Sequence, residues 1–91
     1  MNVVEDISNE SGEHILHLIY CPGCKTHHGF DSRWTFNNDY EKPTFSPSML
    51  INEHLPKRCH SFVTNGQIRF LDDCWHDLKG KTLDLESVEF K

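Results

Sequence analysis

Short hydrophobic segments are separated by short polar segments along this chain, a pattern that predicts β-strands joined by tight turns. Residues 3–7 and the stretch "HILHLIY" at 14–20 fit two short strands with a turn at 9–12 between them. Residues 28–36 are rich in aromatic side chains and are predicted to be extended, and the "NND" at 37–39 reads as the turn that ends them. No repeat or low-complexity segment interrupts this pattern.

The clearest local signal lies in "CHSFVTNGQIRFLDDC", residues 59–74. Asn65-Gly66 is the preferred pair for a two-residue type I′ hairpin loop, so the strands on either side are predicted to pair outward from it. Opposite residues of a hairpin share a face. Counting outward therefore puts Cys59 on the same face as the apolar Val63 and Phe70, and puts His60 on the other face.

The remaining elements are predicted from proline, glycine and capping residues. Pro43 and Pro47 exclude a helix interior, so residues 45–51 are predicted to form an edge or irregular strand. Asp72 or Asp73 could cap one short helix that stops at Gly80, and residues 81–90 are predicted to end the chain with a short strand. The expected fold is mostly β, a small α+β domain with β-hairpins and one short helix.

Composition limits the classes of protein that fit. A chain of 91 residues is predicted to be one domain, residues 1–91, whose own core gives a thin stability margin. The formal net charge is −5 and no basic cluster stands out, which argues against binding to nucleic acid. The sequence shows no apolar stretch of about 20 residues and no signal-peptide pattern, so a cytoplasmic protein without membrane contact is predicted.

In a reducing compartment the four cysteines favour a metal site over disulfides. Cys21-Pro22-Gly23-Cys24 brings two sulfurs together at a strand end, and Zn²⁺ is the default ion for such thiolates. Cys59 is predicted as the third ligand, with Cys74 or His76 as the fourth. Hairpin geometry slightly favours Cys74. A closed four-ligand site would hold one structural zinc ion per chain.

Other residues leave alternatives open. His27 or His28 could replace Cys59 as a ligand. A catalytic zinc would instead keep an open position beside an acid or His60, and residues 72, 73 and 77 are acids that could also be helix caps. His14 and His17, three apart in a presumed strand, are expected on opposite faces. The aromatic residues are expected in the core rather than on a base-stacking platform, namely Trp34, Phe36, Tyr40 and Phe45.

The segments "RWTFNNDYEKPTFSPSML", "RCHSFVTNGQIRFLDDCWHDLKGKTLDL" and "CPGC" resemble a family of small uncharacterised zinc-binding proteins of bacteriophages and prophages, over most of residues 20–85. That family is often labelled "ammonia monooxygenase", which is a large membrane-embedded copper complex unlike this chain. The resemblance implies a zinc ribbon or rubredoxin-like knuckle and favours His76 over Cys74 as the fourth ligand. Lys25 departs from the usual glycine of such knuckles.

These observations favour a phage-type zinc-binding module that works by binding a host or phage protein, and that inhibits or redirects host machinery. An enzyme is less favoured, and its most plausible form is a zinc-dependent hydrolase with an open metal site. A nucleic-acid-binding zinc ribbon is the other alternative. It would need the scattered basic residues on one face, namely Lys57, Arg58, Arg69, Lys79 and Lys81. The sequence does not fix the oligomeric state.

Overall fold

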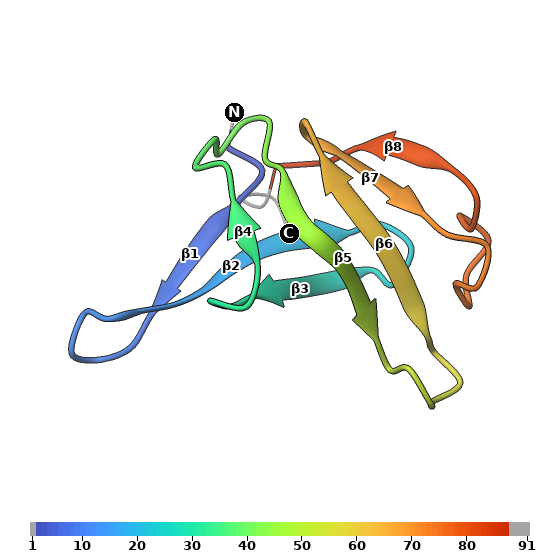
Figure 1. The fold of residues 1–91 in the computed structure, drawn as a ribbon, viewed down its shortest axis with the longest axis horizontal. Coiled ribbons are helices and arrows are strands. Elements are labelled where there is room, and N and C mark those ends of the chain that lie inside the picture. Colours follow the sequence, from blue (N-terminus) through green and yellow to red (C-terminus); the bar gives the residue numbers. More distant parts are fainter. Residues whose placement is uncertain (1, 88–91) are drawn as a thin grey trace.

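Two antiparallel β-sheets make up the described part of the chain. A computed structural model describes residues 2–87. Its strands are β1 (Glu5–Ser8), β2 (His14–Cys21), β3 (Thr26–Phe30), β4 (Thr35–Phe36), β5 (Phe45–Ile51), β6 (Cys59–Thr64), β7 (Gln67–Phe70) and β8 (Thr82–Asp84). One sheet has the order β1-β2-β3 and the other has the order β4-β5-β6-β7-β8 (Figure 1). The mostly-β prediction is confirmed.

The β6–β7 hairpin forms in the predicted register. Thr64 lies opposite Gln67, and Ser61 lies opposite Phe70. Asn65 and Gly66 both have positive φ angles, 51° and 81°, as a type I′ turn requires. Val63, Ile68 and Phe70 are buried on one face, as alternation predicts. Cys59 is buried with them at the start of β6, while neighbouring His60 points to the outer face of the sheet.

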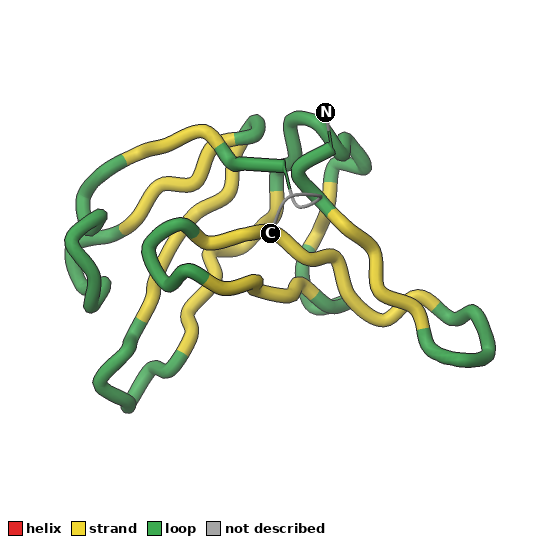
Figure 2. The backbone as a smooth tube through the Cα atoms, turned by 180° about the vertical axis from the view of Figure 1, so that it is seen from behind, coloured by secondary structure: helices red, strands yellow, loops and turns green. Residues whose placement is uncertain are grey.

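The predicted helix at residues 72–80 is wrong, because residues 2–87 fold without any helix (Figure 2). The segment forms a series of single turns, in which the Cys74 N–H bonds to the Leu71 carbonyl. The Trp75 N–H bonds instead to the carbonyl of Arg58, just before β6. That bond holds the segment against the sheet and prevents a continuous helical ladder. Asp and Gly favour turns as much as helix ends, so the sequence signal was ambiguous.

Three other segments differ in detail from the prediction. A turn at Asp31, whose carboxylate accepts the Arg33 N–H, divides the extended region 28–36 into β3 and β4. The strand at 45–51 has the predicted bounds and is irregular, but it lies between β4 and β6 and is not an edge. The last strand is limited to Thr82–Asp84, and residues 88–90 of its predicted range lie outside the described residues.

His14 and His17 lie together, so the prediction that they face opposite ways is wrong. Ile7 pairs with Leu16 and Ser8 pairs with His14, which leaves one extra residue on β2 at this point. Such a β-bulge resets the alternation of side chains along the strand. The two imidazole rings consequently lie 4.1 Å apart between centroids.

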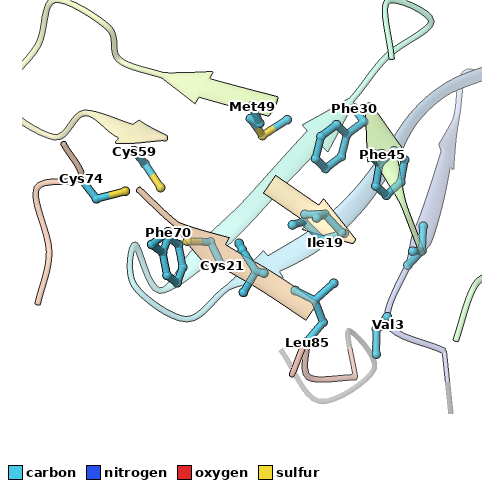
Figure 3. Packing of buried hydrophobic residues seen from close by; sticks show 13 residues of the cluster. Val3, Ile19, Cys21, Phe30, Phe45, Met49, Cys59, Phe70, Cys74 and Leu85 are labelled. Carbon is cyan, nitrogen blue, oxygen red and sulfur yellow. The ribbon is translucent and has the colours of Figure 1, made fainter. Parts of the chain in front are cut away.

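The core lies between the inner faces of the two sheets. Ile19 and Phe30 come from the three-stranded sheet, and Phe30 stacks on Phe45 of β5 with ring centroids 4.0 Å apart. Trp34, Phe36 and Tyr40 pack against this core, as expected from the sequence. At one end of the core, Cys21, Cys59 and Cys74 gather near Phe70 (Figure 3). None of the described segments is an apolar helix of membrane-spanning length.

Candidate catalytic and metal site

A cluster of sulfur and imidazole groups joins the two sheets at the cysteine end of the core. Cys21 ends β2, Cys24 closes the turn before β3, His28 lies on β3 and Cys59 begins β6. The four possible ligand atoms of these residues all lie within 4.8 Å of one another, and all four cysteines of the chain are free thiols. The set could therefore hold one metal ion.

Local structure explains how Cys21 and Cys24 converge. The β2–β3 ladder ends at the Cys21–Thr26 pair, and the Lys25 N–H bonds to the Cys21 carbonyl. The Cys24 N–H points at the Cys21 sulfur at 3.4 Å. Gly23 leaves room for the His76 ring, which a Cβ at this position would overlap. Lys25, with φ of 57°, adopts a conformation that glycine favours, although the chain has lysine where such knuckles usually have glycine.

Two histidines in this region carry a buried ring nitrogen without a hydrogen-bond partner among the described residues. These atoms are Nε2 of His28 and Nδ1 of His76. The Nε2 atom of His76 lies 3.6 Å from the Cys59 sulfur, and His76 also groups with Cys59 and Cys74 as a second candidate ligand set. Buried polar atoms in proteins are normally satisfied, so the unpartnered Nε2 of His28 fits a site that a cation completes. His76 faces Cys59 with its other nitrogen, Nε2, and its unpartnered Nδ1 gives no such support.

Cys74 is close to the cluster, but its sulfur already has backbone partners. It accepts the His60 N–H at 3.2 Å and donates its S–H to the His60 carbonyl at 3.0 Å. The predicted ligands Cys21, Cys24 and Cys59 thus come together in one group with His28, which the sequence offered only as a replacement for Cys59. His27 lies instead against Tyr20 on β2.

The thiols of the cluster influence one another's protonation. A hydrogen bond between Cys59 and Cys21 lowers the pKa of Cys21 and raises the pKa of Cys59. Burial raises the pKa of Cys24 against the opposing hydrogen bond from the Trp75 indole, whose Nε1 lies 3.4 Å from the Cys24 sulfur. Without a cation, a hydrogen bond links the side chains of Cys21 and Cys59. A divalent ion would displace the thiol protons of the cluster as thiolate ligands form.

A second constellation lies on the outer face of the five-stranded sheet, on the opposite side of β6 from Cys59. The Oγ atom of Ser48 lies 3.0 Å from Nε2 of His60, and Nδ1 of His60 lies 3.3 Å from Oδ2 of Asp73. If Nδ1 carries the proton and donates it to Asp73, Nε2 is free to accept the Ser48 hydroxyl proton. Serine, histidine and aspartate are thus connected in the order that nucleophilic acyl transfer uses.

Asp73 is held in place from its other side by Arg58. Nη2 and Nε of the guanidinium lie 2.6 and 3.0 Å from Oδ2 of Asp73. Partial desolvation opposes ionisation of Asp73, but the hydrogen bonds from Arg58 and His60 outweigh it and keep the Asp73 pKa below its ordinary value. The carboxylate is therefore charged at neutral pH and is oriented by two donors.

The irregularity in β5 places Ser48 beside His60. Phe45 pairs with Val63 and Met49 pairs with Ser61, so the three residues 46–48 of β5 lie opposite one residue of β6. Bulges of this kind redirect side chains and are common beside active sites. The Trp34 indole N–H adds a hydrogen bond of 3.4 Å to the Ser48 carbonyl. This bond helps to hold the irregular part of β5 in place.

Sequence reasoning missed Ser48 and assigned other roles to its partners. The sequence offers His60 as a ligand candidate that the hairpin register sets aside and as a base beside an open zinc site, and it offers Asp73 as a helix cap or as an acid at that site. The "SPSM" around Ser48 matches no nucleophile-elbow pattern. The useful signal was the hairpin register, which already put His60 on the face opposite Cys59.

Comparison with known protein families gives one match. The family model described as "Bacterial ubiquitination-like system serine protease (BubE)" matches residues 2–71. The matched part includes Ser48, His60 and the ligand candidates through Cys59, and it ends two residues before Asp73. No curated protein and no solved structure matches the chain. The match does not test the phage origin or the zinc content expected from the sequence.

Proposed function

The chain belongs to the BubE family of bacterial ubiquitination-like system serine proteases, and from this premise we propose that it hydrolyses an amide bond with Ser48 as nucleophile. His60 is the general base and Asp73 is the carboxylate that orients it. The observation that carries this proposal is the continuous chain from Ser48 Oγ through His60 to Asp73, with distances of 3.0 and 3.3 Å. Its substrate would be a protein of such a ubiquitination-like system.

In this mechanism the Ser48 oxygen attacks the carbonyl carbon of the substrate while its proton moves to Nε2 of His60. The protonated imidazole then gives that proton to the leaving amine, and the acyl group remains on Ser48. Water, activated by the same nitrogen, releases the acid and restores the serine. Asp73 stays ionised throughout and stabilises the imidazolium, with Arg58 fixing its position.

The outer face of the sheet around Ser48 and His60 offers a place for the substrate. Leu50 lies opposite His60, and Phe62 follows His60 on the same face; both are half-buried. The Arg69 guanidinium lies over the Phe62 ring at 5.0 Å. Apolar surface beside a polar reaction centre is typical of ligand sites. Binding a protein substrate here is also compatible with the protein-interaction role expected from the sequence, whose host or phage partner stays a prediction.

We assign the metal a structural role and propose Zn²⁺ as the ion. Cys21 and Cys59 are 0 and 1% exposed, and four protein donors that lie within 4.8 Å of one another fill a tetrahedral coordination sphere without a water ligand. This burial favours a closed site of Cys21, Cys24, Cys59 and His28 over the open-site zinc hydrolase, with His76 as the alternative nitrogen ligand. When bound, the ion supplies a rigid link between the two sheets and takes no part in bond cleavage.

A fluorophosphonate probe, which phosphonylates activated serines, tests the proposal directly. Intact mass spectrometry should show one label on the wild type, none on Ser48→Ala, and one on Ser46→Ala, an exposed serine on the same strand. Asp73→Asn should slow the rate of labelling by about 10⁴-fold, as loss of the orienting carboxylate does in serine proteases. The matched control Asp72→Asn, one residue away, should leave the rate unchanged. Labelling that survives in Ser48→Ala would contradict the assignment.

A further inference from the structure

A second group of possible metal ligands lies on β1 and β2, in the three-stranded sheet. It consists of Asp6 on β1 and of His14 and His17 on β2. Nδ1 of His17 lies 2.6 Å from Oδ1 of Asp6 and 3.2 Å from Nε2 of His14. The third edge, from Nε2 of His14 to Oδ1 of Asp6, is 3.5 Å. Three ligand atoms from two strands therefore meet at one point.

Hydrogen bonding alone does not account for this convergence. The single proton on His17 Nδ1 can serve Asp6, and then that nitrogen has nothing to offer Nε2 of His14. If Nε2 of His14 is also protonated, two N–H groups face each other across 3.2 Å. If it is not, a lone pair faces an N–H that is directed elsewhere. A cation at the centre of the triangle would satisfy all three atoms at once.

The size of the triangle fits a transition-metal ion. Ligands at about 2.0–2.1 Å from a tetrahedral or octahedral ion lie about 2.8–3.4 Å apart, and the three observed edges of 2.6, 3.2 and 3.5 Å bracket that range. We propose that Asp6, His14 and His17 bind a divalent transition-metal ion such as Zn²⁺. Two imidazoles and a carboxylate suit such ions better than Mg²⁺ or Ca²⁺, which take oxygen ligands.

Surrounding residues orient the ligands from outside. The Tyr40 hydroxyl donates to Oδ2 of Asp6 at 2.6 Å, which leaves Oδ1 directed at the histidines. The His17 ring packs against Phe36 and Phe45, with centroids 4.5 and 5.9 Å away. Partners of this kind fix ligand geometry in known metal sites. The β2 bulge supplies the remaining condition, because without it His14 would face the other way.

This site differs from the sulfur cluster in chemistry and in access. Side-chain exposures of 42% for His14 and 35% for Asp6 leave it open to solvent. An adjoining hollow of about 330 Å³ is lined by His14, His17, Asp31, Ser32 and Trp34. Three protein ligands leave at least one coordination position for water or a small anionic group from that side. The proposal does not rest on the proposed peptidase function.

Zinc stoichiometry provides the test. Isothermal titration calorimetry measures how many Zn²⁺ ions bind per chain. The wild type should bind one more ion than His17→Ala, and one more than the double variant that combines His14→Ala and His17→Ala. The matched control His54→Ala, an exposed histidine in the loop before β6, should keep the wild-type number. Tyr40→Phe should retain the site but weaken its affinity by about 10–100-fold, as loss of an outer hydrogen bond does.

Asp6→Asn separates loss of a ligand from misfolding, because it keeps the shape of the side chain and leaves the imidazoles in place. It should also lose one ion while its far-ultraviolet circular dichroism stays that of the wild type. Equal stoichiometry in the wild type and in the double histidine variant would overturn the proposal. So would an extra ion that survives in both Asp6→Asn and His17→Ala.

Discussion

Cys74 differs in its contacts from the other three cysteines, because its thiol forms hydrogen bonds with both the backbone N–H and the carbonyl of His60. Leaving a buried backbone group without a partner costs about 1–3 kcal/mol. We therefore expect Cys74→Ala to keep the metal of the sulfur cluster while the free energy of unfolding falls by about that amount. Labelling of Ser48 by the fluorophosphonate should also slow, since His60 is held less firmly. Elemental analysis, urea unfolding and labelling rates measure the three effects.

Cys59→Ala serves as the contrasting variant, because Cys59 faces the three other candidate ligands. It should lose the metal of the sulfur cluster. If Cys74→Ala loses that metal as well, Cys74 belongs to the ligand set, as the hairpin geometry predicted from the sequence.

At this scale the sequence was informative about residues with a strong chemical preference. The spacing of Cys21 and Cys24 predicts them as metal ligands, and the hairpin register predicts Cys59 as a third. Ser48 could not be found in the same way, because serine is common and its role depends on a bulge that brings it to His60. The sequence predicts Asp73 as a helix cap, because its contacts with His60 and Arg58 are not visible in the local pattern. A carboxylate beside a turn fits several functions until its neighbours in space are known.

At the scale of elements, the turn of the β6–β7 hairpin makes a sharp prediction. Gly66 has φ of 81°, and a Cβ there would lie 3.1 Å from the Lys42 Cα. A non-glycine residue in this left-handed region costs about 1–2 kcal/mol, so Gly66→Ala should reduce the free energy of unfolding by at least that much. Asn65→Gly, at the neighbouring position with φ of 51°, is the control and should change it less. Urea denaturation followed by circular dichroism would compare them; equal losses would argue against backbone strain as the cause.

The same hairpin explains which elements could be predicted. Asn65-Gly66 specifies a turn type and hence a register, so β6 and β7 formed where expected. The segment after β7 carried only an acid, a glycine and a few apolar residues, and these fit a chain of turns as well as a helix. Burial of Cys74 and His76 and the bond from Trp75 to Arg58 decided between them. Those contacts are tertiary, and a local pattern does not contain them.

Strand β6 also connects the two functional features. Successive residues of a strand point to opposite faces, so Cys59 faces the metal cluster while His60 faces Ser48. Two neighbouring residues of the turn that follows β7 both contact His60. The Cys74 thiol binds the His60 backbone, and the Asp73 carboxylate binds the His60 ring. The geometry of the proposed reaction centre should therefore depend on how firmly the cluster holds the start of β6.

At the scale of the whole molecule, the sulfur cluster brings side chains of the two sheets together at one end of the core that they share. Cys21, Cys24 and His28 belong to the β2–β3 hairpin, and Cys59 belongs to the five-stranded sheet. A chain of 91 residues buries too little surface for a large margin of stability from that core alone. A metal cross-link at one end of the core would consequently have a large effect on the stability of both sheets.

Removal of the metal should therefore unfold the two sheets together. Structural zinc contributes an apparent ~10–16 kcal/mol in small zinc-binding peptides, which matches or exceeds the ~5–15 kcal/mol total stability of ordinary domains. After chelation we expect the strand signal in circular dichroism and the fluorophosphonate labelling of Ser48 to disappear in parallel, and both to return when Zn²⁺ is restored. His17→Ala should respond in the same way, because its ligand group is separate from the cluster. A chelated chain that keeps its sheets but loses labelling would show that the metal acts on the local geometry of Ser48 and His60 and not on the stability of the sheets. One that keeps both would show that the core between Phe30 and Phe45 is sufficient by itself.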